Sequence, residues 1–513
     1  MTDNPLVIAV DTSTTSTKAI IVDAQGKVLA EGRREIPMLN PAQGFYEHDP
    51  RLWWTTTNES VGEAISKLDP KDRERIAAMC VTHQRESFAP FDDDGNPLRN
   101  GILWLDQRAT KQILQYGSDE IHALSGKPAD VTPALYKMAW VKENEPDVLP
   151  KAARVVDVHG YVVRMLTGQW TSSVACADSL GLFDIAAQDY SDKLLDIAGV
   201  RREQMSDLKK PGEIIAEIKP EITKVWGLKQ TIPLVSGMGD GQAAGVGAAA
   251  VEPHVLYLNL GTAVVAGVHG PDYQYGQAFR TLAAGLPDWY DFEILQSSGA
   301  FLSTWFRESL GNPELGAKPD PALDEAASKV DPGCNGLITM PYWNAVQSPY
   351  WDPRAKGAQV GWRGSHDRPA AYRSILESIG IEMRRNMDGL EEATGNTITE
   401  IRAVGGGTRS TLWRQIMTDA TGVPITACTE DEITALGAAV AAMSVTGVHG
   451  EPNIFTYAEK MASFGDVTEP DQNLYEIYRE VGEIQGKLYP LLKEINNEIQ
   501  AFVEKRPDSR LTS

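Results

Sequence analysis

Residues 11–18 read DTSTTSTK, six consecutive Ser and Thr residues between an aspartate and a lysine. Hydroxyl groups and successive backbone N–H groups in a concave turn are donors that hold an anion, above all a phosphate. Apolar stretches at 6–10 and 19–23 flank the run, so it forms the turn of a hairpin. The turn contains neither Gly nor Asn, which such turns usually use. A hydroxyl-rich strand edge is the commoner explanation of such a run taken alone.

A second group with chemical potential is Asp240, which lies between glycines in SGMGDGQAAGVGAAA at 236–250. The small residues after it predict a tightly packed helix, and glycine on both sides lets backbone or substrate approach closely. A carboxylate at a helix N-terminus is favoured as the anion, so it can accept a proton from an alcohol. The more common role of an aspartate at this position is an N-cap.

A third cluster places three glycines between an apolar strand and a helix, in AVGGGTRSTLWRQIMTDATGVPI at 403–425. Backbone without Cβ atoms can lie flat against a planar ring or a ribose. A plain turn between strand and helix explains the glycines equally well. The two common nucleotide motifs, GxxxxGK[ST] and a GxGxxG after a strand, are missing.

A dense polar set follows the expected strand 76–82 and consists of His83, Gln84, Arg85 and Glu86. Open α/β sheets bind ligands at the carboxyl ends of their strands. Neighbouring Arg and Glu side chains can together bind several hydroxyl groups, and Trp104 can face a sugar ring. A solvated loop with a surface ion pair is the alternative for this segment.

The elements that must position these groups open with antiparallel strands joined by a tight turn at 24–27. A helix is expected over 49–68, and it leads into the strand at 76–82 as a parallel connection. Residues 254–270 then repeat the pattern of the first hairpin, which is a strand, a short hydroxyl-containing turn and a second strand. NLGTA at 259–263 forms the tip. Two such hairpins indicate a duplicated unit with a ligand between the copies.

The chain length of 513 residues exceeds a single hydrophobic core, which predicts two domains, at 1–250 and 251–513. Gly and Ala crowd together at the expected boundary, 245–253. The contents of apolar residues (42%) and charged residues (23%) are those of an ordinary globular protein. Residues 473–505 show helical periodicity, although Pro490 is expected to kink or divide that helix.

The net charge of −22 argues against a nucleic-acid or anionic-membrane partner, because either requires clustered Lys and Arg. The four cysteines, Cys80, Cys176, Cys334 and Cys428, show no metal-binding spacing, as expected in a reducing cytosol. The first residues lack a basic segment followed by an apolar one, and no uninterrupted apolar run of membrane-spanning length occurs. We therefore expect a cytoplasmic protein that is neither exported nor membrane-embedded.

Taken together and in this order, the four segments resemble those of the FGGY family of carbohydrate kinases, and the resemblance covers nearly the whole chain. The hairpin tips at 11–18 and 258–263 look like the family's two phosphate hairpins. The segment GDGQAA at 239–244 resembles its catalytic-base segment, and GGGTRSTLW at 405–413 its adenosine segment. Residues 133–140 and 360–380 are similar to the two stretches by which the family is usually recognised.

The resemblance implies an α/β fold with two ribonuclease-H-like domains of the actin-like ATPase superfamily around a central cleft that closes on ATP, Mg²⁺ and a sugar. It implies that Asp240 is the general base and that Asp11 lies near the metal ion. Phosphate contacts then fall to Thr14, Thr15, Lys18, Gly261 and Thr262, and nucleoside contacts to Gly406, Gly407 and Thr408. The sugar would lie among Asp240, His83, Gln84, Arg85, Glu86 and Trp104. The resemblance also allows a homo-oligomer.

The motifs point to two different acceptors. HQRES at 83–87 and SPYWDPRAKGA at 348–358 resemble glycerol kinases, whereas 258–268 and 405–425 look more like xylulokinases. Glycerol kinases typically have Gln after the catalytic Asp, but Gly241 stands here, and its missing side chain is expected to leave room for a larger substrate. We therefore predict a ketopentose such as xylulose, with glycerol or another polyol as the alternative. A non-catalytic actin-like ATPase and a sugar sensor are remote alternatives, because the acceptor residues and the acidic chain argue against them.

Overall fold

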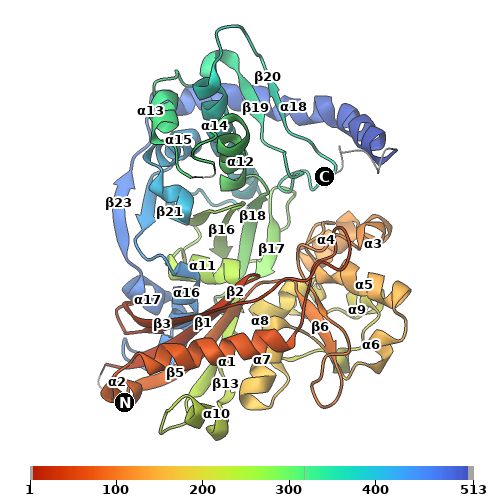
Figure 1. Ribbon diagram of the computed structural model, residues 1–513, viewed down its shortest axis with the longest axis vertical. Coiled ribbons are helices and arrows are strands. Elements are labelled where there is room, and N and C mark those ends of the chain that lie inside the picture. Colours follow the sequence, from red (N-terminus) through yellow and green to blue (C-terminus); the bar gives the residue numbers. More distant parts are fainter. Residues whose placement is uncertain (1–3, 317, 506–513) are drawn as a thin grey trace.

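Two β-sheets with the same core strand order form the two lobes of the protein (Figure 1). The structure is a computed structural model that describes residues 4–316 and 318–505. The first sheet has the order β13-β14-β5-β1-β2-β3. Its strands are β1 (Leu6–Thr12), β2 (Ser16–Val22), β3 (Val28–Glu35), β5 (Ile76–His83), β13 (Ile214–Glu217) and β14 (Pro233–Gly239). We call the part built on this sheet the first lobe.

The second sheet has the order β17-β18-β16-β15-β21-β22-β23 and supports the second lobe. Its strands are β15 (Val255–Leu260), β16 (Val264–Gly270), β17 (Arg280–Ala283), β18 (Tyr290–Gln296), β21 (Glu400–Val404), β22 (Ile425–Cys428) and β23 (Phe464–Thr468). In both sheets an antiparallel hairpin is extended by one antiparallel strand on one side and by two parallel strands on the other. The duplication expected from the two hairpins, and the predicted fold class, are confirmed.

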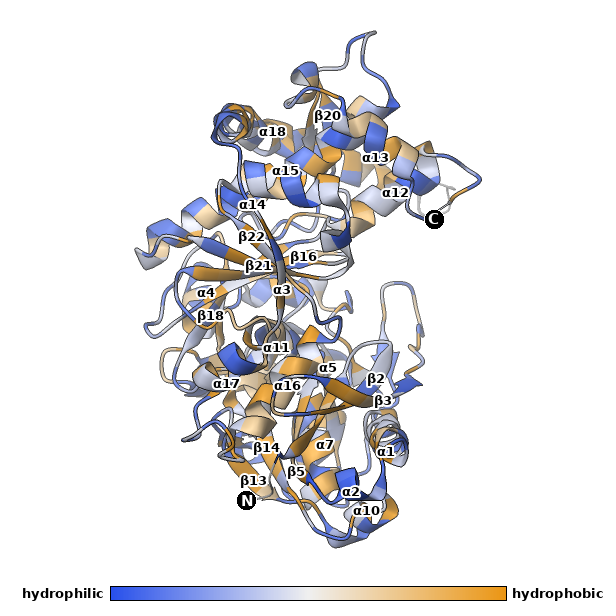
Figure 2. Ribbon diagram, turned by 90° about the vertical axis from the view of Figure 1, so that its left-hand side faces the viewer, coloured by the Kyte–Doolittle hydropathy of each residue, from blue (hydrophilic) through white to orange (hydrophobic). Residues whose placement is uncertain are grey.

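Both faces of the first sheet are buried, which explains the unbroken apolar run in β1. Alternate residues of a strand point to opposite faces. Ile8 and Val10 pack with Val61 of α1 (Arg51–Ser66), whereas Ala9 packs with Leu436 of α16 (Ile433–Ser444). In sequence α16 lies between β22 and β23 of the second sheet, yet it packs against β1 and β5 of the first sheet, so it joins the two lobes. Figure 2 shows the apolar strands between these helices.

Three long helices, α14 (Arg368–Thr394), α15 (Thr411–Thr421) and α18 (Gln472–Glu504), pack together in the second lobe. Pro490 does not divide α18, which runs through it as one helix. Contacts next to the proline hold the helix in place. The buried hydroxyl of Tyr489 donates to Asp352 at 2.6 Å, and the amide of Gln485 donates to the carbonyl of Ser378 at 3.1 Å.

The other predicted elements are present close to their expected bounds. The helix expected over 49–68 is α1, and the strand expected over 76–82 is β5. The turn at 24–27 uses Gly26 at a φ of 82°, which only glycine adopts without strain. Among the described residues, no helix combines the length and the apolar character needed to cross a membrane.

A small four-stranded sheet, in the order β4-β7-β6-β8, extends the first lobe at the carboxyl end of β5. Its strands are β4 (Glu47–His48), β6 (Phe88–Phe91), β7 (Gly101–Ile102) and β8 (Arg154–Asp157). The loop 84–87 joins β5 to β6, and the segment that carries Trp104 follows β7. Strands therefore anchor both ends of the loop that carries the polar side chains after β5.

Candidate active site

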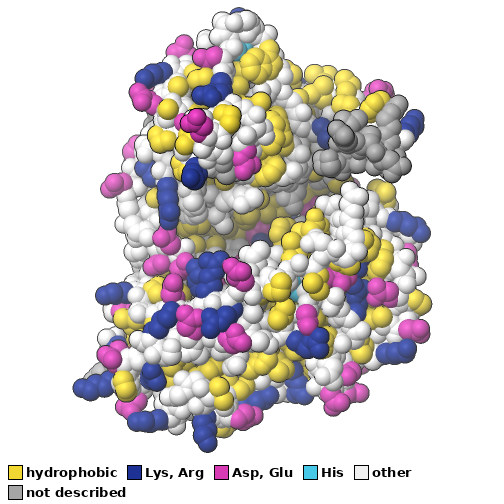
Figure 3. Space-filling view, in the orientation of Figure 1, with side chains coloured by type: hydrophobic (Ala, Val, Ile, Leu, Met, Phe, Trp, Pro, Cys, Tyr) yellow, Lys and Arg dark blue, Asp and Glu magenta, His cyan; other side chains and the backbone are white. Residues whose placement is uncertain are grey.

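The surface is hollowed between the two lobes (Figure 3). The first hairpin, formed by β1 and β2, belongs to the first lobe. The tip is closed by the backbone N–H of Ser13, which donates to the carbonyl of Ser16 at 2.9 Å. The hydroxyl run divides in two. Thr12 and Thr17 are fully buried, and the Thr17 hydroxyl pairs with Thr56 at 2.7 Å. Only the tip from 13 to 15 is partly or fully exposed, so only these hydroxyls can meet a ligand.

Thr14 at this tip is in contact with the acceptor side of the predicted site. The indole Nε1 of Trp104 donates to the Thr14 hydroxyl at 3.0 Å, and Trp104 is 38% exposed. Its neighbour Thr15 is exposed. The structure therefore brings together one residue expected at the phosphates and one expected at the sugar.

Lys18, at the start of the second strand of the hairpin, forms an ion pair with Glu432, the N-cap residue of α16. The pair joins the first sheet to the loop before α16. The residue before Glu432, Asp431, accepts a hydrogen bond from Arg409 of the glycine segment at 2.7 Å. Adjacent residues of this loop thus pair with the first hairpin and with the glycine segment.

Asp11 lies at the floor of this charged region, opposite Lys18 in the hairpin ladder. Burial, followed by the charges of Asp240 and Glu432, raises the pKa of Asp11 to about 7. The positive charge of Lys18 acts in the opposite direction. A buried carboxylate among other carboxylates is a place where a cation is favourable.

The residues around Asp11 fit a magnesium ion. Mg²⁺ in kinases usually keeps several waters and takes one or two carboxylates plus substrate phosphates as ligands. The Oδ1 atom of Asp11 is buried without a hydrogen-bond partner, and is thus a free oxygen donor. Within the described residues, no group of three or more His, Cys, Asp or Glu side chains could hold a metal. The one carboxylate of Asp11 is within the range of one or two that a phosphate-bound Mg²⁺ takes from a protein.

Asp240 is the first residue of α11 (Asp240–Gly247), which follows β14 directly. The N-cap is Gly239, so the alternative role of Asp240 as an N-cap is excluded. Its Oδ1 accepts hydrogen bonds from the Nε of Arg85 and from the backbone N–H of Gly241, each at 2.8 Å. The side chain is 41% exposed, so the carboxylate is oriented by the protein and still accessible.

Arg85 and Glu86 are not a surface pair but members of a buried ion network that crosses between the lobes. Arg85 lies 2.8 Å from Glu293 of β18, and Glu293 in turn lies 2.7 Å from Arg280 of β17. Arg280 completes the chain by pairing with Glu86. The order is therefore Asp240, Arg85, Glu293, Arg280 and Glu86, with alternating charge. We call this set the cross-lobe network.

The glycines beside Asp240 make room for this network. A Cβ atom on Gly239 would lie 2.4 Å from the Cγ atom of Arg85, and one on Gly241 would lie 2.5 Å from Oε2 of Glu293. The expectation that Gly241 leaves room for a larger substrate is therefore wrong. The space that a side chain at position 241 would fill is already occupied by the Arg85–Glu293 ion pair. The sequence shows that Gly241 lacks a side chain, but it does not show which other residues fill the space.

His83 and Gln84 are buried, as are Arg85 and Glu86. His83 is fully buried at the end of β5, and burial lowers its pKa, so the ring is neutral. The amide of Gln84 donates to the carbonyl of Ser13 at 3.3 Å, which ties the loop 84–87 to the first hairpin tip. The structure thus brings Arg85, Glu86 and Asp240 together, with His83 and Gln84 as their support.

The second hairpin tip, with Gly261 and Thr262, is backed by the start of α12 (Ala300–Leu310). The N–H groups of Ala300 and Phe301 donate to the carbonyls of Gly261 and Thr262 at 2.8 and 3.0 Å. Both carbonyls therefore accept hydrogen bonds within the protein, which holds the tip against α12. The Thr262 side chain is exposed.

The glycine segment packs against the base of the second hairpin. A Cβ atom on Gly407 would lie 2.8 Å from the Cβ of Leu260, whereas one on Gly406 would meet no atom within 4 Å. Gly406 thus borders open space, and Gly407 fills a packing position. The hydroxyl of Thr408 donates to the carbonyl of Gly405 at 2.7 Å, so it closes the turn.

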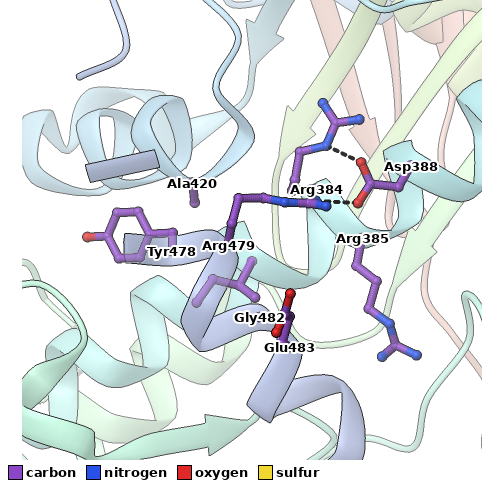
Figure 4. Close-up of a pocket in the computed structure, with 9 residues that line it drawn as sticks. Arg384, Arg385, Asp388, Ala420, Tyr478, Arg479, Gly482 and Glu483 are labelled. Carbon is purple, nitrogen blue, oxygen red and sulfur yellow. Dashed lines mark hydrogen bonds and ion pairs between the residues drawn. The ribbon is translucent and has the colours of Figure 1, made fainter. Parts of the chain in front are cut away.

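A separate cavity of about 180 Å³ lies between α14 and α18, away from all of these residues (Figure 4). Arg384 and Arg479 both point toward Asp388 in it, and the Arg384 Nε donates to that carboxylate at 2.8 Å. Arg384 also pairs with Glu391, so both arginines have carboxylate partners. None of the predicted site residues lines this cavity, so it is not the candidate active site.

Arg280 and Glu293 are the site residues that sequence reasoning missed. Both lie in apolar strands, and a fully buried charge in such a strand is the signal that could have found them, because it must be paired. The sequence does not identify the partner. Both partners of Glu293 come from elsewhere in the chain, and one of them from the other lobe.

Comparison with family models matches the N-terminal domain of the FGGY family of carbohydrate kinases to residues 6–247 and the C-terminal domain to residues 256–445. A protein named xylulose kinase from Escherichia coli (strain K12) is 28% identical over 443 residues, which cover 85% of this chain and 89% of that protein. A glycerol kinase from Leifsonia xyli subsp. xyli is 30% identical over 469 residues, covering 86% and 89%.

Among solved structures, ligand-bound xylulose kinase from Lactobacillus acidophilus superposes with a TM-score of 0.90 at 22% sequence identity. The match covers 96% of this chain and 100% of that one. At this identity the likeness shows a shared fold with two lobes.

Proposed function

The chain belongs to the FGGY family of carbohydrate kinases, and from that premise we propose that it transfers the γ-phosphate of ATP to a hydroxyl group of a neutral ketopentose such as xylulose. As a member of this family it is a phosphotransferase with an alcohol group as acceptor. The observation that carries the proposal is the position of Asp240, which is oriented by Arg85 and still accessible at the start of α11.

Asp240 is the proposed general base. An alcohol is a poor nucleophile at neutral pH, and a carboxylate within about 3 Å orients it and takes its proton as the new bond forms. The hydrogen bonds from Arg85 and Gly241 fix one carboxylate oxygen, which leaves the other to face the acceptor. Proton transfer to Asp240 therefore needs no rearrangement of the side chain.

The phosphate chain is proposed to lie between the two hairpin tips, with the nucleoside against Gly406 and Thr408. Phosphoryl transfer depends mainly on positioning and on neutralisation of charge. Lys18 and the donors of Thr14, Thr15, Gly261 and Thr262 supply the protein's share of that neutralisation. Mg²⁺, when bound beside Asp11, would neutralise further charge on the phosphates.

The proposed division of the chain follows from these roles. Residues 1–250 would bind the acceptor and carry the first phosphate hairpin, and residues 251–513 would bind the nucleotide. The cross-lobe network qualifies this division, because Arg280 and Glu293 of the second part reach the acceptor residues. Closure of the cleft would also exclude water that otherwise hydrolyses ATP.

Charge at the network favours a neutral acceptor over a sugar acid. The two arginines, Arg85 and Arg280, face the three carboxylates of Asp240, Glu86 and Glu293. Within this network, no positive charge is left over to bind a substrate carboxylate, and its accessible end is Asp240. A second candidate is glycerol, which is favoured by the adjacent Arg85 and Glu86 in a glycerol-kinase-like segment.

A panel of acceptors at equal concentration with Mg²⁺ and ATP, followed by ADP release, tests the proposal. It should include xylulose, ribulose, glycerol, erythritol and gluconate, with no acceptor as the control. We expect the largest kcat/KM for a ketopentose and no turnover of gluconate. Turnover of glycerol above every pentulose would move the assignment to the second candidate, and preference for gluconate would refute the charge argument.

A further inference from the structure

Buried ion pairs connect the proposed acceptor side chains of the first lobe to two strands of the second. Glu293 lies on β18 and accepts from the Nε of Arg280, on β17, at 2.8 Å. The other oxygen of Glu293 faces Arg85, and the other end of Arg280 faces Glu86. Glu293 thus holds the side chain of Arg85, and Arg280 holds that of Glu86.

The arginines and glutamates of this network are buried, so their charges must stay paired. Glu293 is fully buried, and Arg280 and Glu86 are each 3% exposed. A charge removed from water is costly unless it is paired and hydrogen-bonded, and loss of one partner leaves the other unpaired. Arg85 and Glu86 therefore keep one orientation as long as Arg280 and Glu293 are in place.

The strand that carries Arg280 is itself fastened to the first lobe. The backbone N–H of Thr281 donates to the carbonyl of Gly126 at 2.8 Å, and that of Ala283 donates to Asp178 at 2.9 Å. Lys127, which is buried with Asp178, donates to the carbonyl of Thr281 at 2.9 Å. β17 therefore bonds both to its own sheet and to the first lobe.

We infer that Arg280 and Glu293 are positioning residues for the acceptor, and that they set the orientation of Arg85 and Glu86 from the second lobe. The inference rests on the proposed function, because it assumes that Arg85 and Glu86 contact the acceptor. It adds that acceptor recognition depends on two residues outside the expected acceptor domain.

Arg280→Lys is the first test, because it keeps the buried positive charge but loses the planar fork that reaches both carboxylates. We expect the KM for the preferred acceptor to rise roughly tenfold or more, since hydrogen bonds to charged groups contribute this much to binding. The KM for ATP should change by less than about twofold. Arg280→Met should raise the acceptor KM further than Arg280→Lys does.

A matched control is Arg51→Met, at an exposed arginine paired with Asp49, which should leave both KM values unchanged. Glu293→Gln provides a second measurement, because it preserves shape and releases Arg85 toward Asp240. We expect a rise in acceptor KM there too. Thermal unfolding of each variant distinguishes a general loss of folding from a change confined to the positions of Arg85 and Glu86.

The outcomes distinguish the two proposals. If the parent phosphorylates a neutral sugar and Arg280→Lys does so with unchanged acceptor KM, the positioning inference is overturned and the proposed function stands. An equal rise in the KM for acceptor and ATP also overturns it, because that pattern indicates a general role in joining the lobes. If the parent phosphorylates no neutral sugar or polyol, the proposed function itself fails.

Discussion

The Nε atom of Arg85 lies 2.8 Å from Oδ1 of Asp240, although the two residues are 155 positions apart in the chain. One follows the strand β5 and the other begins the helix α11 after the neighbouring parallel strand β14. Parallel neighbours end at the same edge of a sheet, and this edge brings a guanidinium to a carboxylate. The same contact orients the proposed base and starts the cross-lobe network.

Asp240→Asn should lower kcat by roughly 10² to 10⁴ without unfolding the protein, because it removes a general base and keeps the side-chain shape. Initial-rate measurements with the preferred acceptor, together with thermal unfolding, test this. Asp93→Asn, at an exposed position, is the control and should retain parental activity. Full activity of Asp240→Asn would remove the mechanism proposed above.

Lys18→Met should lower kcat/KM for ATP by roughly 10- to 1000-fold, because it removes a positive charge that we propose contacts the phosphates. Glu432→Gln leaves Lys18 in place and removes only its ion-pair partner, so its effect should be much smaller. Comparison of the two variants under the same conditions separates phosphate binding from the ion pair. Equal losses in both would show that the ion pair is what matters at Lys18.

Gly241→Ala should impair acceptor use, because its Cβ would lie 2.5 Å from Glu293 and 2.7 Å from Arg85. We expect the acceptor KM to rise and the ATP KM to stay near the parental value. Gly364→Ala, where a Cβ meets no atom within 4 Å, is the matched control. A variant with parental kinetics at position 241 would mean that the network tolerates displacement.

Gly406→Ala should weaken nucleotide binding while leaving thermal stability unchanged, because its Cβ would meet no protein atom. Gly407→Ala differs, since its Cβ would lie 2.6 Å from the ring of Trp413 and should destabilise the fold. ADP binding by calorimetry and unfolding temperature are the two measurements. Unchanged ADP affinity in Gly406→Ala would place the nucleoside elsewhere.

Asp291→Asn should change how stability depends on pH. Burial, with the neighbouring Glu293 charge adding to it, raises the pKa of Asp291 from 3.8 to about 8. The folded protein therefore holds this proton more tightly than the unfolded chain. The stability this supplies is complete below about pH 4 and is lost as pH rises through about 8, by at most about 1.4 kcal/mol per pH unit.

The asparagine variant lacks this proton, so its free energy of unfolding relative to the parent should increase as pH rises from 5 to 8. Urea unfolding of both proteins at several pH values measures the difference. Asp272→Asn, at an exposed aspartate, is the control. A constant difference across this range would show that Asp291 titrates normally.

Local patterns determined much of the fold. The paired apolar runs on each side of the two hydroxyl-bearing tips predicted two hairpins, because neighbouring segments pair without help from the rest of the chain. The helix after residue 50 and the strand after it followed from periodicity. The order of these elements, and of the segments at 239–244 and 405–413, indicated the family and the class of reaction.

Tertiary structure decided which of the expected side chains face a ligand. In the first hairpin, packing against α1 takes Thr17 into the interior and leaves Thr15 outside, although the sequence presents them as equivalent hydroxyls. Packing contacts of α18 likewise carry the helix through Pro490, because stability there depends on neighbouring helices more than on local propensity.

The pairing of the charges in the proposed acceptor site depends on the assembly of the two lobes. The sequence alone indicated Arg85, Glu86 and Asp240 as polar groups at strand ends, because that is a local property. The partners of Arg85 and Glu86, which are Glu293 and Arg280, lie about 200 residues later in the chain, and only the packing of the two sheets brings them within bonding distance. Long-range electrostatic pairing follows from three-dimensional proximity, which a single sequence does not encode in its local pattern.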